Sequence, residues 1–153
     1  EKDLAYYYGP YWKDFIESSE ACDTYCSRLN KLAQEDPYLL LAHHYTRYIG
    51  DLSGGQILCK IAKNALNPPA GEGLHFYEFP NIHNAKEWKT TYREVLDTLS
   101  LDQSQKNALF DEANFAFRLN MYMFDEIKSE DPYPAMTALK GFWKVITGSI
   151  RGK

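Results

Sequence analysis

YTRYIGDLSGGQ, residues 45–56, is the stretch that decides how the rest of the chain is interpreted. It lies inside a long pattern of apolar residues at helical spacing, which begins after Asp36 and stops at Asn67-Pro68-Pro69. We expect one long helix over about residues 37–66, with Asp36 as its N-cap and Pro37 at its first position. Three glycines fall within residues 50–55. Each destabilises a helix by roughly 1 kcal/mol relative to alanine, so their presence needs a physical reason.

Two interpretations of these glycines are open. Gly50 and Gly54 lie one turn apart, so a planar group could approach the helix backbone closely on that face. Arg47 precedes them on the same face, and Asp51 lies within its reach at i+4, where the carboxylate could hold ordered water. Alternatively, one helix ends at Gly50, a polar turn follows, and a new helix starts at Gln56. Spacing alone does not decide between the two.

The remaining pattern predicts an all-α, multihelical single domain, because 153 residues are one domain's worth of sequence. Further helices are expected over residues 21–32, 85–99 and 101–127. Their apolar faces are expected to include Tyr25, Leu29 and Leu32; Trp88, Tyr92, Val95 and Leu99; and Leu109, Ala113, Phe117 and Met121.

The tail, residues 128–153, becomes basic and amphipathic from Ala135 onward. It could make a peripheral contact with an anionic membrane, but a terminal helix that packs on the domain is favoured because its basic residues are few.

Composition excludes several classes of protein. The formal net charge of −4 argues against a nucleic-acid partner, and no stretch approaches the roughly 20 apolar residues of a transmembrane segment. The three cysteines fit no closed disulfide framework and suggest a reducing compartment. Cys22 and Cys26 stand at i and i+4, but without further candidate metal ligands we expect ordinary buried or half-buried thiols.

Residues 52–56, LSGGQ, also match the signature pentapeptide of ABC-type ATPases. Such an ATPase needs a phosphate-binding G-x-x-x-x-G-K-[ST] loop after a strand, and an apolar strand ending in Asp downstream. This chain contains neither motif, so we reject that interpretation.

The wider string, residues 45–56, closely resembles the distal helix of heme oxygenases of the animal type. The resemblance covers about residues 1–127, the predicted heme oxygenase domain. It extends through Asp3-Leu4, Tyr8-Gly9-Pro10, Gly71-Glu72-Gly73-Leu74, Phe79-Pro80-Asn81-Ile82, Lys89, Tyr92-Arg93, Phe117 and Asn120-Met121.

The resemblance implies a heme site on the distal helix. Gly50 and Gly54, with Ser53 beside them, match residues that contact one face of the heme. The family's chemistry needs protons to reach oxygen bound at the heme iron, and a water network held by a carboxylate delivers them. Asp51 matches that carboxylate, whereas Tyr45 and Arg47 match other members of the network. An ionised Asp has no proton to donate, so its implied role is to orient water.

The resemblance also assigns residues around the edge of the heme. Lys89 and Arg93 match the cations that meet the heme propionates, although a Lys and an Arg at i and i+4 are commonly just a solvated face. Phe117 matches the pocket wall, as do Asn120 and Phe124, but an aromatic stripe on a helix is first of all a candidate core.

The family's axial histidine comes from an amino-terminal helix, which we expect upstream of Glu1, so the domain is interpreted as truncated at its amino terminus. No metal ligand is assigned within this chain. His43 matches a family position that does not bind the iron, and His44 follows it on the distal helix. His75 and His83 fall in stretches expected to be solvated loops.

The implied activity is the oxidation of heme to biliverdin, carbon monoxide and ferrous iron. It would use O2 and electrons from an NADPH-dependent cytochrome P-450 reductase, on the cytoplasmic side of the endoplasmic reticulum membrane. The alternative is a non-catalytic helical or heme-binding fragment, because the helix with the axial histidine is absent.

Overall fold

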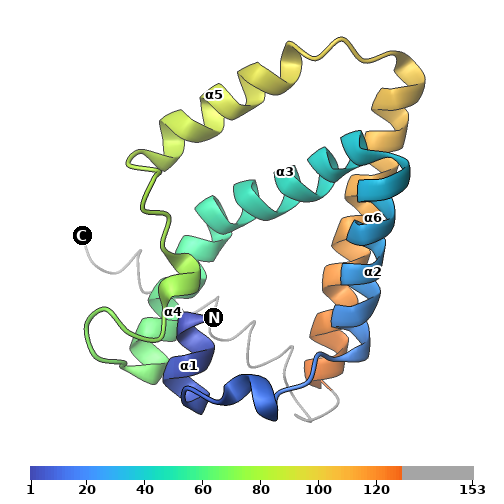
Figure 1. Cartoon of the computed structure of the whole chain (residues 1–153). Coiled ribbons are helices and arrows are strands. Elements are labelled where there is room, and N and C mark those ends of the chain that lie inside the picture. The colour runs from blue at the N-terminus through green and yellow to red at the C-terminus, as the bar shows by residue number, and fades with distance from the viewer. Residues whose placement is uncertain (129–153) are drawn as a thin grey trace.

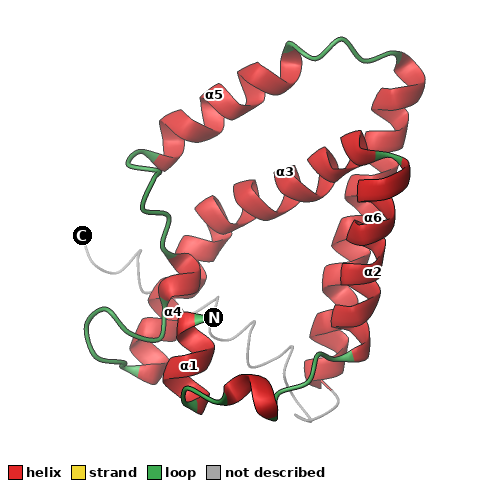
Figure 2. Cartoon of the chain, in the orientation of Figure 1, coloured by secondary structure: helices red, strands yellow, loops and turns green. Residues whose placement is uncertain are grey.

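The computed structural model describes residues 1–128, and within them it contains helices and loops but no strand (Figure 2). The all-α expectation is confirmed, whereas the tail of residues 129–153 lies outside the described part of the chain. The α-helices are α1 (Lys2–Tyr8), α2 (Glu20–Glu35), α3 (Leu40–Gly50), α4 (Gln56–Leu66), α5 (Ala85–Asp97) and α6 (Gln103–Lys128). Short 3-10 turns occupy Trp12–Asp14, Pro37–Leu39 and His75–Tyr77.

Helix α3 crosses the middle of the molecule (Figure 1). Helices α2 and α6 lie side by side and pack against one side of α3, whereas α5 runs along the other side. Helix α4 continues α3 beyond a bend and ends near α1. The segment with the glycines is therefore flanked by elements that lie far from it in the sequence.

The long helix expected over residues 37–66 is present as a chain of helical segments. The α-helices do end at Gly50 and begin again at Gln56, as the second interpretation expected, but Asp51–Gly55 between them form a π-helical turn that joins α3 directly to α4 and not a polar turn. In a π turn the backbone hydrogen bonds span five residues instead of four, so the helix continues through the turn. Such turns are frequent at functional sites. The helix ends at Asn67, which adopts the left-handed conformation with φ 44°.

Asp36 is the N-cap residue of the first helical turn, as predicted, but its side chain does not cap the turn. That side chain makes no capping hydrogen bond, although Pro37 does occupy the first helical position. Instead, the backbone carbonyl of Asp36 accepts a hydrogen bond from Leu39 N at 3.0 Å, which is the i to i+3 pattern of a 3-10 turn. Side-chain caps are present at other helices, from Ser19 before α2, Asn84 before α5 and Asp102 before α6.

The core lies where α2, α3 and α6 meet. Tyr25 and Leu32 of α2 are buried as predicted, but the buried face of α6 differs from the predicted one. Ala116 is 0% exposed, so its small side chain lets α6 approach its neighbours closely, whereas Phe117 and Met121 are each 60% exposed. The buried residues of the described part of the chain are Ala21, Tyr25, Leu32, Leu39, Ala42, His43, Leu52, Glu112, Ala116 and Leu119, with the glycines Gly55 and Gly73.

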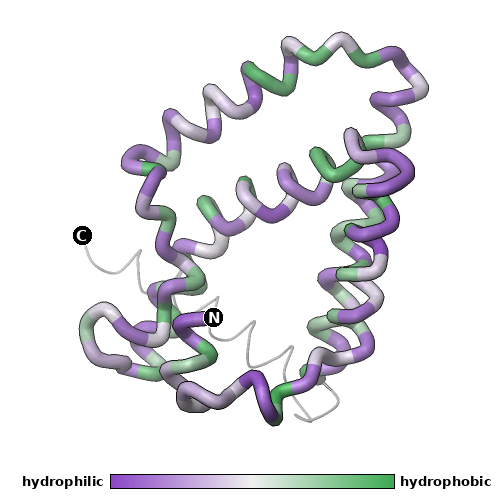
Figure 3. The backbone as a smooth tube through the Cα atoms, viewed as in Figure 1, coloured by the Kyte–Doolittle hydropathy of each residue, from purple (hydrophilic) through white to green (hydrophobic). Residues whose placement is uncertain are grey.

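Hydrophilic and hydrophobic residues alternate along each helix (Figure 3). None of the helices within residues 1–128 has the length and apolar character needed to cross a bilayer.

Candidate active site

The surface formed by Gly50 and Gly54, here called the glycine face, is open. A Cβ atom built on either residue would meet no other heavy atom within 4 Å, and both residues are exposed. Gly55 differs, because it is buried and its Cβ would lie 3.4 Å from the Cβ of Asp51. The glycine face therefore allows a flat group to approach the backbone of the π turn without displacing any side chain.

A charged pair borders this face. Arg47 Nη2 lies 3.5 Å from Asp51 Oδ2, which is the contact expected from their i, i+4 spacing. Arg47 Nη1 also donates a hydrogen bond to Asn120 Oδ1 at 2.8 Å, and Asn120 Nδ2 donates to the carbonyl of Ala116 at 2.8 Å. Helix α6 thus holds the guanidinium, which in turn lies against the carboxylate. Asn120, which the sequence suggested first as a core residue, is a polar partner of the site.

Tyr25 of α2 belongs to the same neighbourhood. Burial raises the pKa of Tyr25, and the nearby Asn120 amide and Arg47 guanidinium only partly oppose this effect. Its phenol therefore stays protonated and can act as a hydrogen-bond donor at neutral pH. An open pocket of about 520 Å³ lies beside these groups, and Tyr25, Arg47 and Asn120 are among the residues that line it.

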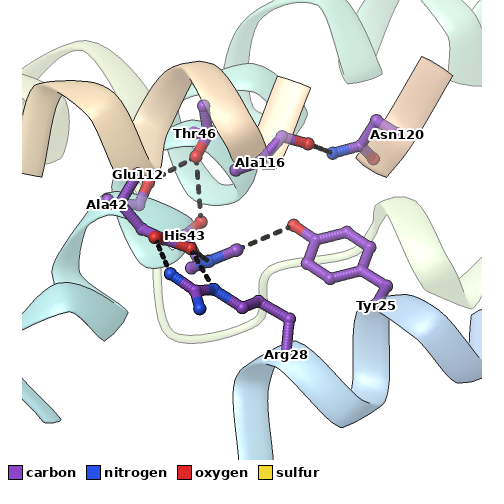
Figure 4. A network of polar contacts seen from close by, with 8 residues as sticks. All are labelled: Tyr25, Arg28, Ala42, His43, Thr46, Glu112, Ala116 and Asn120. Atoms are coloured by element: carbon purple, nitrogen blue, oxygen red, sulfur yellow. Dashed lines mark hydrogen bonds and ion pairs between the residues drawn. The ribbon is translucent and has the colours of Figure 1, made fainter. Parts of the chain in front are cut away.

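A buried polar cluster joins α2, α3 and α6 (Figure 4). His43 is 3% exposed; its Nε2 lies 2.8 Å from Glu112 Oε1 and its Nδ1 lies 3.2 Å from the Tyr25 hydroxyl. Arg28 donates from Nε to Glu112 Oε1 at 3.0 Å and also pairs with the second carboxylate oxygen. Burial by itself would raise the pKa of Glu112, but the hydrogen bonds from Arg28 and His43 outweigh it and lower the pKa. Both ring nitrogens of His43 are engaged, so this residue is not available as a metal ligand.

The other three histidines occupy different settings. His44 Nδ1 lies 2.6 Å from the Tyr92 hydroxyl. His75 was expected to be solvated, and that expectation is wrong, because its Nδ1 lies 3.0 Å from Asp3 Oδ1 with only 23% of the side chain exposed. His83 lies exposed in the loop before α5, as expected.

Helix α5 brings two cations to the site. Lys89 Nζ donates to Ser53 Oγ at 2.8 Å and to the carbonyl of Leu52 at 3.5 Å, within the π turn. Arg93 Nε donates to the Tyr45 hydroxyl at 3.4 Å. The alternative in which Lys89 and Arg93 face only solvent is therefore wrong. The structure brings together Tyr45, Ser53, Lys89 and Arg93, which the sequence could relate only through a family resemblance.

Phe117 and Phe124 of α6 are 60% and 64% exposed, so the interpretation of these rings as core residues is wrong within the described part of the chain. Their faces are free to contact an apolar group. Cys22 and Cys59 are half-buried and Cys26 is exposed, all as free thiols. Burial raises the pKa of the Cys22 thiol and Cys26 raises it further, so Cys22 is a weak nucleophile at neutral pH.

Comparison with known proteins gives one consistent answer. The model of the heme oxygenase family matches residues 1–126. A heme oxygenase from Guillardia theta is 52% identical over 126 residues, 82% of this chain and 53% of the relative. Human heme oxygenase 1 is 45% identical over 129 residues, 84% of this chain and 45% of the relative. The chain therefore spans about half the length of the curated relatives it matches.

Solved structures agree with the sequence comparison. Heme oxygenase-1 from Synechocystis, crystallised in complex with heme, superposes with a TM-score of 0.79 at 42% identity. The superposition covers 97% of this chain and 63% of that structure. A second Synechocystis heme oxygenase, in complex with heme and NO, gives a TM-score of 0.79 at 43% identity over 85% of this chain and 56% of that structure.

Proposed function

Since this chain belongs to the heme oxygenase family, we propose that the protein it represents oxidises heme to biliverdin, carbon monoxide and ferrous iron. The open glycine face is the observation that carries the proposal. Arg47 and Asp51 lie on one edge of this face, and Lys89 reaches Ser53 on the other. A flat ligand fits the glycine face in shape, and Lys89 with Arg93 supplies two positive charges that suit a dianion.

The residues present fit a heme. Gly50 and Gly54 would contact the plane of the ring, because a Cβ on either residue has nothing within 4 Å and the space is free. Ser53 would lie beside that face, and the exposed ring of Phe117 would supply an apolar wall. Lys89 and Arg93 would bind the propionates, exchanging their present contacts with Ser53 and Tyr45 for carboxylate partners.

Bound heme would supply an iron that takes up oxygen and electrons, together with the ring that is opened. The chain's own contribution is the control of protons. Asp51 carries no proton when ionised, so it accepts hydrogen bonds from water and orients that water toward the glycine face. Arg47, held by Asn120, fixes the carboxylate, and the Tyr45 hydroxyl extends the polar edge on the α5 side.

The axial ligand, the electron donor and the membrane contact are proposed from the similarity to the heme oxygenase family. We expect the axial ligand of the iron from an amino-terminal helix of the family, because His43 is held by Tyr25 and Glu112. An NADPH-dependent cytochrome P-450 reductase would supply the electrons, with O2 as oxidant. Residues 1–127 would form the catalytic domain, and the tail of residues 128–153 would contact the cytoplasmic face of the endoplasmic reticulum membrane or pack on the domain.

A reconstitution experiment tests the function. This chain is joined to the amino-terminal part of the Synechocystis relative and incubated with heme, NADPH and a cytochrome reductase. We expect biliverdin, measured by its absorbance, and carbon monoxide, measured by its capture on deoxymyoglobin. The same chimera with His83→Gln serves as a control, because His83 lies in an exposed loop away from the site. A heme complex that forms without either product would instead indicate a non-catalytic heme-binding module.

A further inference from the structure

Five aromatic rings fill the space between α3 and α5. Tyr92 of α5 stacks on Trp88 of the same helix, with ring centroids 4.9 Å apart and an interplanar angle of 10°. Tyr48 of α3 stacks on Trp88 at 5.8 Å and 27°. Stacked rings at these separations are in contact, so the cluster joins the two helices through conjugated groups rather than through aliphatic side chains.

The other two rings extend the cluster in opposite directions. The Tyr45 hydroxyl accepts a hydrogen bond from Arg93 at the proposed heme edge. The Tyr45 ring stacks on Tyr92, with ring centroids 6.2 Å apart and an interplanar angle of 27°. His44 stacks on Tyr48 at 4.3 Å and 20°. Tyr48 is 39% exposed, so the rings run without a gap from the proposed active site to the surface of the molecule.

One hydrogen bond in the cluster links an oxidisable phenol to a base. The Tyr92 hydroxyl lies 2.6 Å from His44 Nδ1. A neutral imidazole that carries its proton on Nε2 accepts the phenol proton through Nδ1. Burial raises the pKa of Tyr92, so the phenol keeps its proton until an electron is removed. A phenol that has lost an electron is a strong acid, and His44 is already placed to receive the proton.

We propose that the five rings form a one-electron relay in which Tyr92 is the radical site and His44 is its proton acceptor. A one-electron oxidant, such as a ruthenium(III) tris-bipyridine complex that is reduced to ruthenium(II), removes an electron from Trp88 and leaves the indole radical cation. Tyr92 then passes an electron to Trp88 and its phenol proton to His44, which yields neutral Trp88, a neutral tyrosyl radical and a protonated imidazole. A one-electron reductant such as ascorbate returns the electron, and His44 returns the proton.

This relay goes beyond the proposed function. In an enzyme that activates oxygen, an oxidising equivalent that reaches the stacked rings would be held on Tyr92 as a neutral radical until a reductant removes it. The relay itself depends only on ring contacts and one hydrogen bond. It can therefore be tested without heme, and its failure would leave the proposed activity untouched.

The test is flash photolysis of the heme-free chain. A photogenerated ruthenium(III) tris-bipyridine complex serves as the one-electron oxidant, and radicals are followed by transient absorption and electron paramagnetic resonance. We expect a long-lived tyrosyl signal that is lost in Tyr92→Phe and forms more slowly in Trp88→Phe. Both substitutions keep an aromatic ring in the stack, so a purely packing role would leave the signal unchanged. Tyr11→Phe is the control, because Tyr11 is 74% exposed.

A second pair of variants tests the proton acceptor. Glutamine at position 44 can accept a hydrogen bond from Tyr92 but cannot take up its proton. We therefore expect His44→Gln to shorten the lifetime of the tyrosyl radical, whereas His83→Gln leaves the lifetime at the wild-type value. Circular dichroism verifies that each variant is folded. An unchanged long-lived signal in Tyr92→Phe, or an unchanged lifetime in His44→Gln, would overturn the proposal.

Discussion

The guanidinium of Arg47 lies 3.5 Å from the carboxylate of Asp51, one turn further along the helix, at the point where α3 passes into its π-helical turn. The same guanidinium is held from α6 by the amide of Asn120. Packing between α3 and α6 therefore fixes the position of the Asp51 carboxylate beside the glycine face. Both side chains are partly exposed, so we assign their pairing to positioning rather than to stability.

Gly54→Ala separates helix stability from ligand binding. The added Cβ meets nothing within 4 Å, and alanine is favoured over glycine in a helix by about 1 kcal/mol, so the thermal midpoint of the heme-free protein should rise. Heme affinity should fall, because the methyl group enters the space proposed for the ring. Thermal denaturation and heme titration measure the two effects.

Gly73→Ala is the contrasting control for that experiment. Gly73 has φ +68°, and a Cβ there would lie 2.6 Å from the Tyr7 hydroxyl, so this variant should lose stability with no direct effect on heme contact. If Gly54→Ala bound heme as tightly as the wild type, the glycine face would not be the binding surface.

Lys89→Ala should weaken the binding of heme but not of heme dimethyl ester, whose propionates are uncharged. Exposed ion pairs contribute about 0–1 kcal/mol, which corresponds to a loss of at most roughly fivefold in affinity. Lys86→Ala is the matched control, because Lys86 is an exposed residue of the same helix. Equal losses with heme and with its ester would show that Lys89 acts through Ser53 and not through the propionates.

Glu112→Ala should destabilise the fold. Removing one partner of a buried ion pair costs about 3–5 kcal/mol, and we expect about 2–3 kcal/mol here because the Arg28 side chain is 28% exposed. His43 would also lose its carboxylate partner. Urea unfolding measures the loss, and Glu94→Ala, an exposed change on α5, should leave the midpoint near the wild-type value.

The pH dependence of stability reports on the same carboxylate. Arg28 and His43 lower the pKa of Glu112 below its ordinary value of 4.5, despite the opposing effect of burial. Because the pKa of Glu112 is lowered in the folded protein, its ionised carboxylate stabilises the fold. This stabilisation is fully present above about pH 4.5 and is lost as the pH falls through the pKa of the folded state. The difference in unfolding free energy between wild type and Glu112→Gln should therefore shrink on acidification. A difference that grew toward acid pH would contradict the assigned direction.

Much of the fold could be predicted from the spacing of apolar residues. The pattern after Asp36 indicated the long helix, and three close glycines indicated that something interrupts it. Glycine permits both a π turn and a helix end, so only backbone hydrogen bonding could decide between them. The prediction for α6 was wrong because large apolar side chains such as Phe117 and Met121 were expected to be buried. The face of α6 that packs against its neighbours instead carries the small Ala116 and the buried Glu112.

The site could be predicted only where its residues are neighbours in sequence. Arg47 and Asp51 are separated by one turn, so their contact followed from helical geometry. His43 and Glu112 are 69 residues apart, and Tyr92 and His44 are 48 apart. Such pairs depend on how α3, α5 and α6 are placed, and no local pattern in one sequence encodes that placement.

The central claim is that Asp51 directs protons on a glycine face that holds heme, and Asp51→Ala in the reconstituted protein tests it most directly. Heme affinity is measured by titration, and biliverdin formation is measured with reductase and NADPH. The account predicts an affinity close to that of the wild type and a rate of biliverdin formation lower by about 100-fold or more, the usual loss when assisted proton delivery is removed. Wild-type turnover in Asp51→Ala would contradict the claim.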